Sequence, residues 1–140
     1  MMADCVFCSV IEGRLPGSFV YRGDEAVAFL DLFPVHPGHL LIVPRLHVED
    51  LVSCPPGVAG QLFELSAKLA PAVVRATEAA GFNVWTANGK AAGQEVFHLH
   101  LHLLPRFEDD TFGLRFPKSY PQEAGRAELD AMAETIRSEM

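Results

Sequence analysis

An unbroken alternation of histidine with leucine, late in the chain, restricts the possible folds more than any other feature of this sequence. The segment from Phe97 to Arg106 reads FHLHLHLLPR. Successive side chains of a β-strand point to opposite faces of a sheet, so we expect a strand over residues 96–104 that presents three histidines on one face: His98, His100 and His102. The three leucines between them would share the other face, which would lie on the core.

The rest of the chain shows short strand patterns around one long helical pattern. We expect helical turns over residues 6–12, two strand-like stretches separated by a turn at Arg22-Gly23-Asp24, a buried strand over residues 39–44, a long helix from Pro55 to about Ala80, a strand over residues 82–86, and a terminal helix with Leu129, Met132, Ala133 and Ile136 on one face. Pro71 predicts a kink or a break in the long helix, and Gly81 predicts its end. Antiparallel-looking strand pairs with one inserted helix indicate an α+β fold, and the length predicts a single domain over residues 1–140.

Composition and charge exclude several kinds of partner. Hydrophobic residues make up 49% of the chain, which is too many for intrinsic disorder. The balance of 11 basic and 18 acidic residues gives a net charge of −7, so no basic surplus favours a nucleic acid polymer. No run approaches the ~18 apolar residues of a membrane span, and the first residues lack the basic and apolar regions of a secretory signal. With only three cysteines, an odd number, we expect a cytoplasmic protein with no membrane partner.

Three interpretations of the aligned histidines differ in their chemistry. Surface histidines on a half-exposed strand are the simplest, but three of the six histidines at perfect alternation argue against it. A catalytic zinc site is the second, although alternate residues of a straight strand lie roughly 6.5–7 Å apart, too far for three to converge on one ion. The third fits better, because neutral imidazole is a good nucleophile toward phosphorus. Neighbouring histidines can hold its tautomer, bind phosphate oxygens or protonate a leaving group.

The strand motif resembles the His-φ-His-φ-His-φφ signature of the histidine triad (HIT) nucleotide hydrolases and transferases, where φ is apolar. The segment AFLDLFPVHPGHLLIVPRLH is similar to the family's other signature, and NGKAAGQEVFHLHLHLLPR to its phosphate-binding loop and triad strand. CVFC near the start and the amphipathic terminal helix resemble bacterial-type members. The resemblance covers almost the whole chain and implies a HIT-like fold, with an antiparallel sheet, a long inserted helix and a C-terminal helix.

This resemblance implies roles for four residues around the triad. His100 would attack the α-phosphorus of a nucleotide and form a nucleotidyl-histidine intermediate, from which water would release the nucleoside monophosphate. His102 would contact the phosphate, and His39 matches the family histidine beside the active site. Asp31 matches the family's ribose-binding position, where a carboxylate can accept hydrogen bonds from both the 2′- and the 3′-hydroxyl of the ribose. Two plainer interpretations stay open: His39 as a residue that caps a loop, and Asp31 as turn chemistry before Pro34.

The resemblance also implies a phosphate-binding loop ahead of the triad. Its candidate residues are Asn88, Gly93, Gln94, Glu95 and Val96, with successive N–H groups facing phosphate oxygens. The chain departs from the family twice, because many members have an amide where Ala87 stands and some have Ser or Thr where Glu95 stands. We expect the Glu95 carboxylate to point away, with only its backbone involved. Arg106 either reaches a distal phosphate or pairs with Glu108 or Asp109.

Cys5 and Cys8 form a C-x-x-C motif with two possible interpretations. One is a redox pair, which normally follows a strand in a βαβ unit. The other is half of a tetrahedral zinc site. The resemblance implies a structural zinc, one per chain, with His47 and His98 as its other ligands. A zinc-bound His98 is neutral and would support the segment that presents His100. Cys54 reads as a lone thiol.

The resemblance favours a nucleotidyl hydrolase or transferase that needs no redox cofactor. The implied substrates are purine nucleoside 5′-phosphoramidates or dinucleoside polyphosphates, and the implied assembly is a homodimer formed through the long helix and a sheet edge. Three alternatives remain: a nucleotide-binding regulatory protein with incidental turnover, a small redox protein using Cys5 and Cys8, and a uridylyl transferase. The last would have Gln where His102 stands.

Overall fold

The computed structural model describes residues 4–140 of the chain. It divides the chain into two compact units, Met1–Asp110 and Thr111–Met140. The expectation that the chain begins without a secretory signal falls partly on residues 1–3, which lie outside the described residues. No helix in the described part is both long and apolar enough to cross a membrane.

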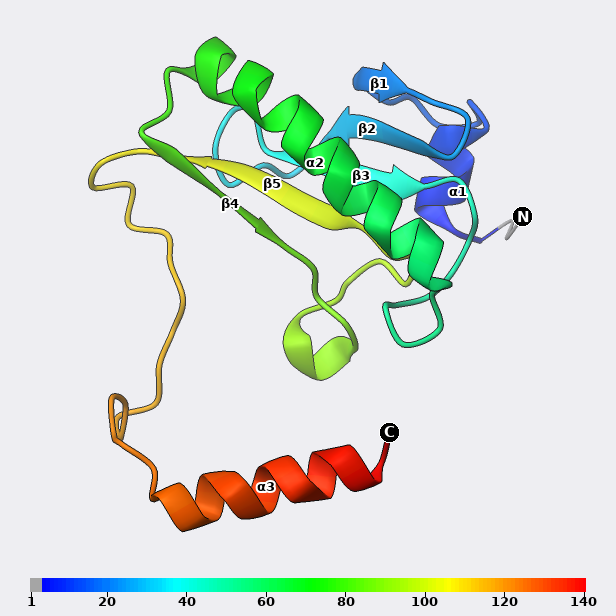
Figure 1. The fold of residues 1–140 in the computed structure, drawn as a ribbon. Helices are drawn as coiled ribbons and strands as arrows, with labels where there is room; N and C mark the ends of the chain where they lie inside the picture. Colours follow the sequence, from blue (N-terminus) through cyan, green and yellow to red (C-terminus); the bar gives the residue numbers. More distant parts are fainter. Residues whose placement is uncertain (1–3) are drawn as a thin grey trace. The chain divides into compact units, whose positions relative to one another are not determined.

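The first unit is built on a five-stranded antiparallel sheet (Figure 1). Its strands are β1 (Phe19–Arg22), β2 (Ala26–Leu30), β3 (Leu40–Pro44), β4 (Gly81–Trp85) and β5 (Leu101–Arg106), in the spatial order β1-β2-β3-β5-β4. β1 and β2 form a hairpin at one end of the sheet and are joined by the expected turn at residues 22–24. β4 forms the opposite edge. This sheet, with one long helix inserted before β4, confirms the predicted α+β fold.

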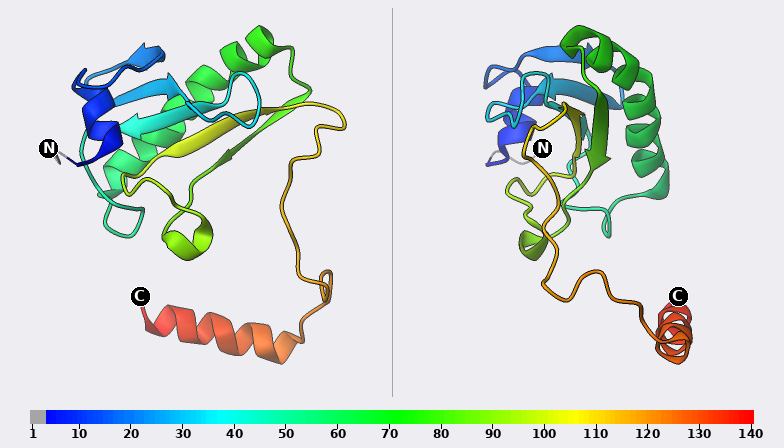
Figure 2. Two further views of the ribbon diagram at one scale, coloured as in Figure 1. Left: turned by 180° about the vertical axis from the view of Figure 1, so that it is seen from behind. Right: turned by 90° about the vertical axis from the view of Figure 1, so that its left-hand side faces the viewer.

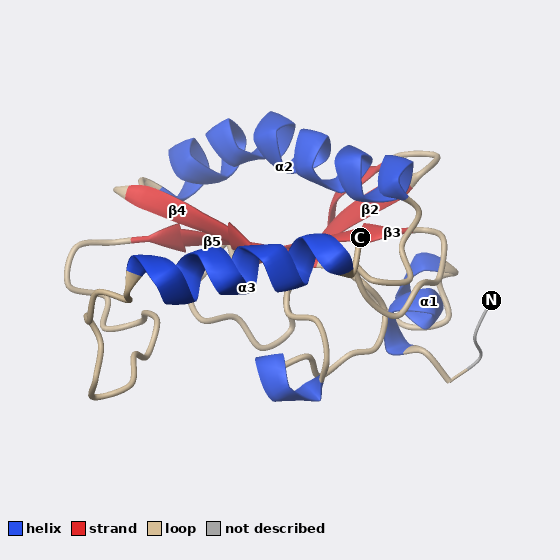
Figure 3. Cartoon of the chain, turned by 60° about the horizontal axis from the view of Figure 1, so that its bottom comes forward, coloured by secondary structure: helices blue, strands red, loops and turns tan. Residues whose placement is uncertain are grey.

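Helix α2 (Pro56–Thr77) covers one face of the sheet, as Figures 2 and 3 show. Its buried residues Leu62, Leu65, Leu69 and Val73 pack with residues of β2, β3 and β5 in the larger core cluster. Of the kink or break expected at Pro71, the break is wrong, because the helix continues through it to Thr77. Pro71 lies on the exposed side, where water can bind the carbonyl that loses its intrahelical partner.

The end of α2 also differs from expectation. The helix ends at Thr77 and is capped by Glu78, which adopts a left-handed conformation with φ of 55° and donates its N–H to the carbonyl of Val74. Gly81, expected to end the helix, instead begins β4. A left-handed residue that closes the last turn is the usual chemistry of a helix end, but here a glutamate does it.

Helix α1 (Val6–Ile11) packs on the opposite face of the sheet (Figure 2). Its residues Phe7 and Val10 join Val27, Phe29, Leu41 and Val43 in a second buried cluster. The sheet is therefore covered on both faces, which explains why β2 and β3 are buried almost throughout rather than at alternate residues.

The last strand begins later than the histidine–leucine pattern suggests. β5 covers Leu101–Arg106 rather than residues 96–104, because the preceding segment is bound to other partners. The N–H of Leu99 donates to the carbonyl of Val48 over 2.7 Å. The alternation itself is kept, since Leu99, Leu101 and Leu103 all lie in the α2-side core.

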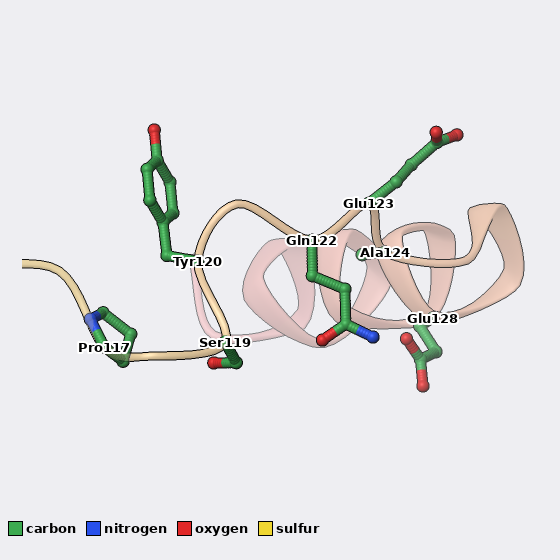
Figure 4. Close-up of a pocket in the computed structure, with 7 residues that line it drawn as sticks. All are labelled: Pro117, Ser119, Tyr120, Gln122, Glu123, Ala124 and Glu128. Atoms are coloured by element: carbon green, nitrogen blue, oxygen red, sulfur yellow. The ribbon is translucent and has the colours of Figure 1, made fainter.

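The second unit consists of an extended segment and helix α3 (Arg126–Ser138). The apolar stripe expected on this helix is present, and Leu129, Met132 and Ile136 are exposed. A shallow hollow in this unit is lined by seven side chains: Pro117, Ser119, Tyr120, Gln122, Glu123, Ala124 and Glu128. Figure 4 shows that they point in different directions, and the set contains neither histidine nor cysteine.

Candidate active site and metal centre

The central histidine of the motif has a defined tautomer. The Nδ1 atom of His100 lies 2.7 Å from the backbone carbonyl oxygen of His98. A carbonyl oxygen only accepts, so Nδ1 carries the ring hydrogen and donates it, and the Nε2 atom keeps its lone pair. The ring is buried, and this burial lowers the pKa of His100. His100 therefore presents a neutral imidazole, the form that can act as a nucleophile.

His39 and His102 form a hydrogen-bonded pair whose direction is set by the backbone. The N–H of Val35 donates to Nδ1 of His39 over 3.2 Å, so the ring hydrogen of neutral His39 is on Nε2. This Nε2 lies 2.9 Å from Nδ1 of His102 and donates to it. The hydrogen of neutral His102 is consequently on its own Nε2, which leaves an N–H donor for a ligand.

Burial keeps this pair uncharged at neutral pH. It lowers the pKa of His39 despite the opposing attraction of the Asp31 carboxylate. Burial, together with repulsion from His100 and His39, lowers the pKa of His102 to about 3. The ring centroids of His100 and His102 are 4.9 Å apart, so a nucleophile and a hydrogen-bond donor stand side by side.

Asp31 lies at the end of β2, beside this pair. Its Oδ2 atom is 3.7 Å from Nε2 of His39, while its Oδ1 accepts the N–H of Phe33 over 2.9 Å. The latter bond is the turn chemistry considered above. Each carboxylate oxygen has further lone pairs, so Asp31 can shape the loop and still accept from a ribose.

The loop before the triad is braced by the buried side chain of Gln94. Its Oε1 accepts the N–H of Gly89 over 2.8 Å, and its Nε2 donates to the carbonyls of Glu49 (2.7 Å) and Val96 (3.2 Å). The Gln94 amide thus holds the shape of the loop, and these three bonds take up its donors and one of its acceptor positions.

Hydrogen bonds within this loop already use some of the N–H groups that were candidates for binding phosphate. The N–H groups of Gly93 and Gln94 donate to carbonyls of the same turn, where Gly93 has a left-handed φ of 88° that favours glycine. The N–H groups of Glu95 and Val96 have no acceptor within residues 4–140. The Glu95 side chain is exposed. Asn88 also has a structural partner, since its Oδ1 accepts the N–H of Leu51 over 2.8 Å.

The first histidine of the motif belongs to a different cluster. Cys5, Cys8, His47 and His98 place four metal-binding atoms within 4.8 Å of one another. The Nε2 of His98 donates to the carbonyl of Pro44 over 2.8 Å, so its Nδ1 has the lone pair and faces the cluster. Burial lowers the pKa of His98 to about 4. This group could hold a metal ion.

The spacing of these atoms fits a tetrahedral ion. Zinc bonds of about 2.3 Å to sulfur and about 2.05 Å to nitrogen give tetrahedral edges of roughly 3.3 Å between nitrogens and roughly 3.6 Å between nitrogen and sulfur. The Nδ1 atoms of His47 and His98 are 3.2 Å apart. Three sulfur–nitrogen distances are 3.4, 3.4 and 3.6 Å. The donor set and the Pro44 contact to His98 are both typical of structural zinc sites.

A second group, Asp31, His39 and His102, also places ligand-type atoms within 4.8 Å. Its hydrogen bonds argue against a metal there. The lone pair of His39 Nδ1 accepts from Val35, and the other nitrogen donates to His102. The group is a chain of donors and acceptors.

Arg106 is engaged by neighbouring side chains. Its Nε and Nη2 atoms donate to the two carboxylate oxygens of Asp110 over 2.7 and 2.6 Å, and Nη1 donates to Oδ1 of Asn83 over 2.7 Å. The acidic partner is thus Asp110 rather than Glu108 or Asp109, because the turn after β5 brings Asp110 back onto the N–H of Phe107.

Two aromatic side chains lie against the histidines of the site. Trp85 on β4, which had no distinct signal in the sequence, stacks on His102, with centroids 4.5 Å apart and rings 8° from parallel. Phe7, which the sequence suggests as a wall for the nucleotide base, contacts the rings of both His98 and His100. Only the register of β4 against β5, which pairs Trp85 with His102, would have revealed the first of these.

Comparison with known proteins identifies the family. A family model described as the HIT domain matches residues 12–109. The chain belongs to the HIT family. An uncharacterized HIT-like protein of Saccharolobus solfataricus is 44% identical over 106 residues, which is 76% of each chain. The adenylylsulfatase HINT3 of Arabidopsis thaliana is 41% identical over 107 residues, which is 76% of this chain but 54% of that longer protein.

Solved HIT structures have the same fold. A HIT family protein of Bacillus anthracis superposes with a TM-score of 0.91 at 36% identity, covering 100% of this chain and 99% of that one. A zinc-bound histidine triad protein of Mycobacterium smegmatis has a TM-score of 0.76 at 31% identity over 98% of both chains. A histidine triad nucleotide-binding protein of Candida albicans has a TM-score of 0.85 at 28% identity, covering 97% and 96%. The chain therefore has a HIT fold and belongs to a family of nucleotide-binding proteins that includes hydrolases.

Proposed function

We propose that this chain hydrolyses purine ribonucleotide conjugates at the α-phosphorus through a covalent nucleotidyl-histidine on His100. The observation that carries the proposal is the bond from Nδ1 of His100 to the carbonyl of His98. It leaves the Nε2 lone pair as the nucleophile.

In the first step a bond forms between Nε2 of His100 and phosphorus, and the bond from phosphorus to the leaving group breaks. The Nε2–H of His102, whose Nδ1 accepts from His39, donates a hydrogen bond to the leaving-group atom. A solvent water gives that atom its proton and is left as hydroxide. In the second step the hydroxide attacks phosphorus, the phosphorus–nitrogen bond breaks, its electron pair returns to Nε2, and nucleoside monophosphate leaves.

The substrate class is supported by the site and by relatives. The Asp31 carboxylate, 3.7 Å from His39, can accept from a ribose hydroxyl, and the N–H groups of Glu95 and Val96 can bind phosphate oxygens. The C. albicans protein is nucleotide-binding and the A. thaliana protein an adenylylsulfatase, a hydrolase of an adenylyl conjugate. The proposed substrates are purine nucleoside 5′-phosphoramidates or dinucleoside polyphosphates. Because Arg106 is bound to Asp110 and Asn83, we place it outside the phosphate site.

We propose that the metal centre holds one structural Zn²⁺ per chain. Cys5, Cys8, His47 and His98 would hold it, and when bound it would crosslink α1 to the segment ahead of β5. The chemistry itself needs no redox cofactor. We propose a cytoplasmic location, because three cysteines, an odd number, do not make a disulfide framework.

We propose that the chain forms a homodimer through α2 and the β4 edge, with neither membrane nor nucleic acid polymer as a partner. β4 is an edge strand, and Phe82 on it and Phe63 on α2 are about half exposed. Unpaired edges and exposed aromatic side chains favour association. Sedimentation of the wild type and of Phe82→Glu tests this assembly: we expect a dimer for the wild type and a monomer for the variant. A wild type that is monomeric at micromolar concentration would contradict the proposal.

A paired assay tests the proposed reaction. Wild-type protein is incubated with adenosine 5′-phosphoramidate or diadenosine tetraphosphate, quenched in alkali, and digested for mass spectrometry. We expect release of adenosine monophosphate and an adenylyl group on the peptide that contains His100. Cleavage without an adduct would refute the covalent mechanism. Binding of adenosine monophosphate without cleavage of either substrate would favour a regulatory nucleotide-binding protein.

A further inference from the structure

The tryptophan at the end of β4 contacts the site, but the proposed reaction gives it no role. Trp85 is the sole tryptophan of the chain. It is the direct cross-strand partner of His102, and their rings are 8° from parallel with centroids 4.5 Å apart. The same indole lies 5.9 Å from the ring of His39. It thus contacts both members of the donor pair.

A single hydrogen bond does not fix the orientation of an imidazole ring. The bond from His39 holds one corner of His102, at Nδ1, but the ring can still turn about its broad χ2 torsion. Turning it over would replace Nδ1 by carbon at that corner and move the Nε2 hydrogen away from a ligand. A parallel aromatic ring at van der Waals distance opposes such rotation.

We propose that Trp85 is a positioning residue for His102, and this inference rests on the proposed function. The indole holds the imidazole plane in the orientation in which Nδ1 accepts from His39 and Nε2–H remains as the donor for the leaving group. Trp85 acts through His102 and touches neither the nucleophile nor phosphorus.

The surroundings of His102 make this role more than packing. The titratable groups that face it are His39 and Asp31 on the segment between β2 and β3, and His100 ahead of β5. β3 contributes the apolar Leu41 as its cross-strand partner. The indole supplies the cover on the β4 side, so its removal would admit water that can compete for both ring nitrogens.

Trp85→Phe and Trp85→Leu form the matched pair that tests the inference, because phenylalanine keeps a stacking ring and leucine keeps only apolar volume. Long-range proton–nitrogen NMR spectra report which ring nitrogen of each histidine carries hydrogen. In the wild type and the Phe variant, we expect the His102 signals of one protonated nitrogen, Nε2, and one unprotonated nitrogen, Nδ1. In the Leu variant we expect both nitrogens to give averaged signals, because the two tautomers exchange. We expect kcat on adenosine 5′-phosphoramidate to fall about tenfold in the Leu variant, with KM within about twofold.

Unaveraged His102 signals together with unchanged kcat in a folded Leu variant would overturn the inference. Trp85→Met replaces that variant if far-ultraviolet circular dichroism shows Leu to be unfolded, and the same two results then decide. The nitrogen spectrum does not depend on turnover. If the wild type cleaves nothing while the spectra behave as expected, the proposed function fails and the positioning role stands.

Discussion

Two histidines two residues apart, His98 and His100, have opposite environments. Each is buried and neutral, and each donates one ring hydrogen to a backbone carbonyl. His98 donates from Nε2, so its Nδ1 lone pair faces two sulfur atoms and a second imidazole. His100 donates from Nδ1, so its lone pair is on Nε2.

The backbone carbonyl that each ring meets therefore selects whether that histidine can bind a metal or act as a nucleophile. A lone pair on Nδ1 that meets three other ligand atoms makes a metal centre. A lone pair on Nε2 beside a neutral donor pair makes a nucleophile site. The two sites are also joined, because the carbonyl that orients His100 belongs to His98, and Phe7 from the C-x-x-C helix contacts both rings.

Replacing the nucleophile should cause the largest loss of activity and should separate the roles of His98 and His100. We expect His100→Ala to lower kcat by at least about 10⁴-fold, because removal of a covalent nucleophile abolishes the first step. Binding of adenosine monophosphate and zinc content should be unchanged, since neither depends on Nε2 of His100. Steady-state kinetics, calorimetric titration and metal analysis measure the three quantities.

His36→Asn is the matched control for that substitution, because His36 pairs with Asp110 and belongs to neither cluster. Turnover of the control should stay within about threefold of the wild type. Residual turnover in His100→Ala equal to the control would show that another group is the nucleophile.

Breaking the metal centre should act on stability first and on chemistry second. We expect Cys8→Ser to lose zinc and to lower the free energy of unfolding by more than about 3 kcal/mol, since structural zinc contributes roughly 10 kcal/mol or more. Cys54→Ser is the control, because Cys54 is a free cysteine outside the cluster. Denaturant unfolding and metal analysis check both variants.

Equal zinc content in Cys8→Ser and Cys54→Ser would contradict the metal centre. A Cys8→Ser protein that loses zinc but keeps full kcat would separate the two sites and contradict the link through the His98 carbonyl.

Disrupting the donor pair should have an intermediate effect. His39→Leu removes the N–H that faces Nδ1 of His102, and we expect kcat to fall about 10²-fold. His39→Gln keeps an N–H donor and should recover part of that loss. Single-turnover kinetics with adenosine 5′-phosphoramidate compares the two, and an equal loss in both would show that the donor at His39 is irrelevant.

The sequence predicts the features of these two sites that depend on residues close together in the chain. The shared face of Leu99, Leu101 and Leu103 follows from alternation alone, and the structure confirms it. The membership of His47 and His98 in one cluster with the C-x-x-C motif came from family resemblance, because the chain separates those residues by about forty to ninety positions. Family resemblance also suggested the nucleophile, but it gave no tautomer.

The features that the sequence missed depend on distant backbone groups. β5 starts late because Leu99 bonds to Val48, and the tautomers follow from Pro44, Val35 and the His98 carbonyl. A pattern of side-chain types contains none of these contacts. The stack of Trp85 on His102 likewise depends on the register of two strands that residues 86–100 separate in the chain, which periodicity does not determine.

Acid should affect the donor pair in a smaller and more gradual way. The pKa of His102 is about 3 in the folded chain because of burial and of repulsion from His100 and His39, and about 6.5 in an unfolded chain. Between these values the unfolded chain binds more protons, so the free energy of unfolding falls as pH is lowered from about 6.5 toward 3. This contribution is fully present above about pH 6.5.

His102→Asn removes that titration while leaving the cysteine cluster intact, so acid loss of zinc is common to both proteins and cancels in the difference. We expect the unfolding free energy of the variant to fall less steeply with acid between pH 6.5 and 4.5, by at most about 1.4 kcal/mol per pH unit. Solvent reaching the partly exposed ring makes the difference smaller. Denaturant titrations at matched zinc concentration measure both slopes. Identical slopes would mean that His102 accepts protons as readily in the folded chain as in the unfolded one, and that the donor pair lacks the burial that distinguishes it.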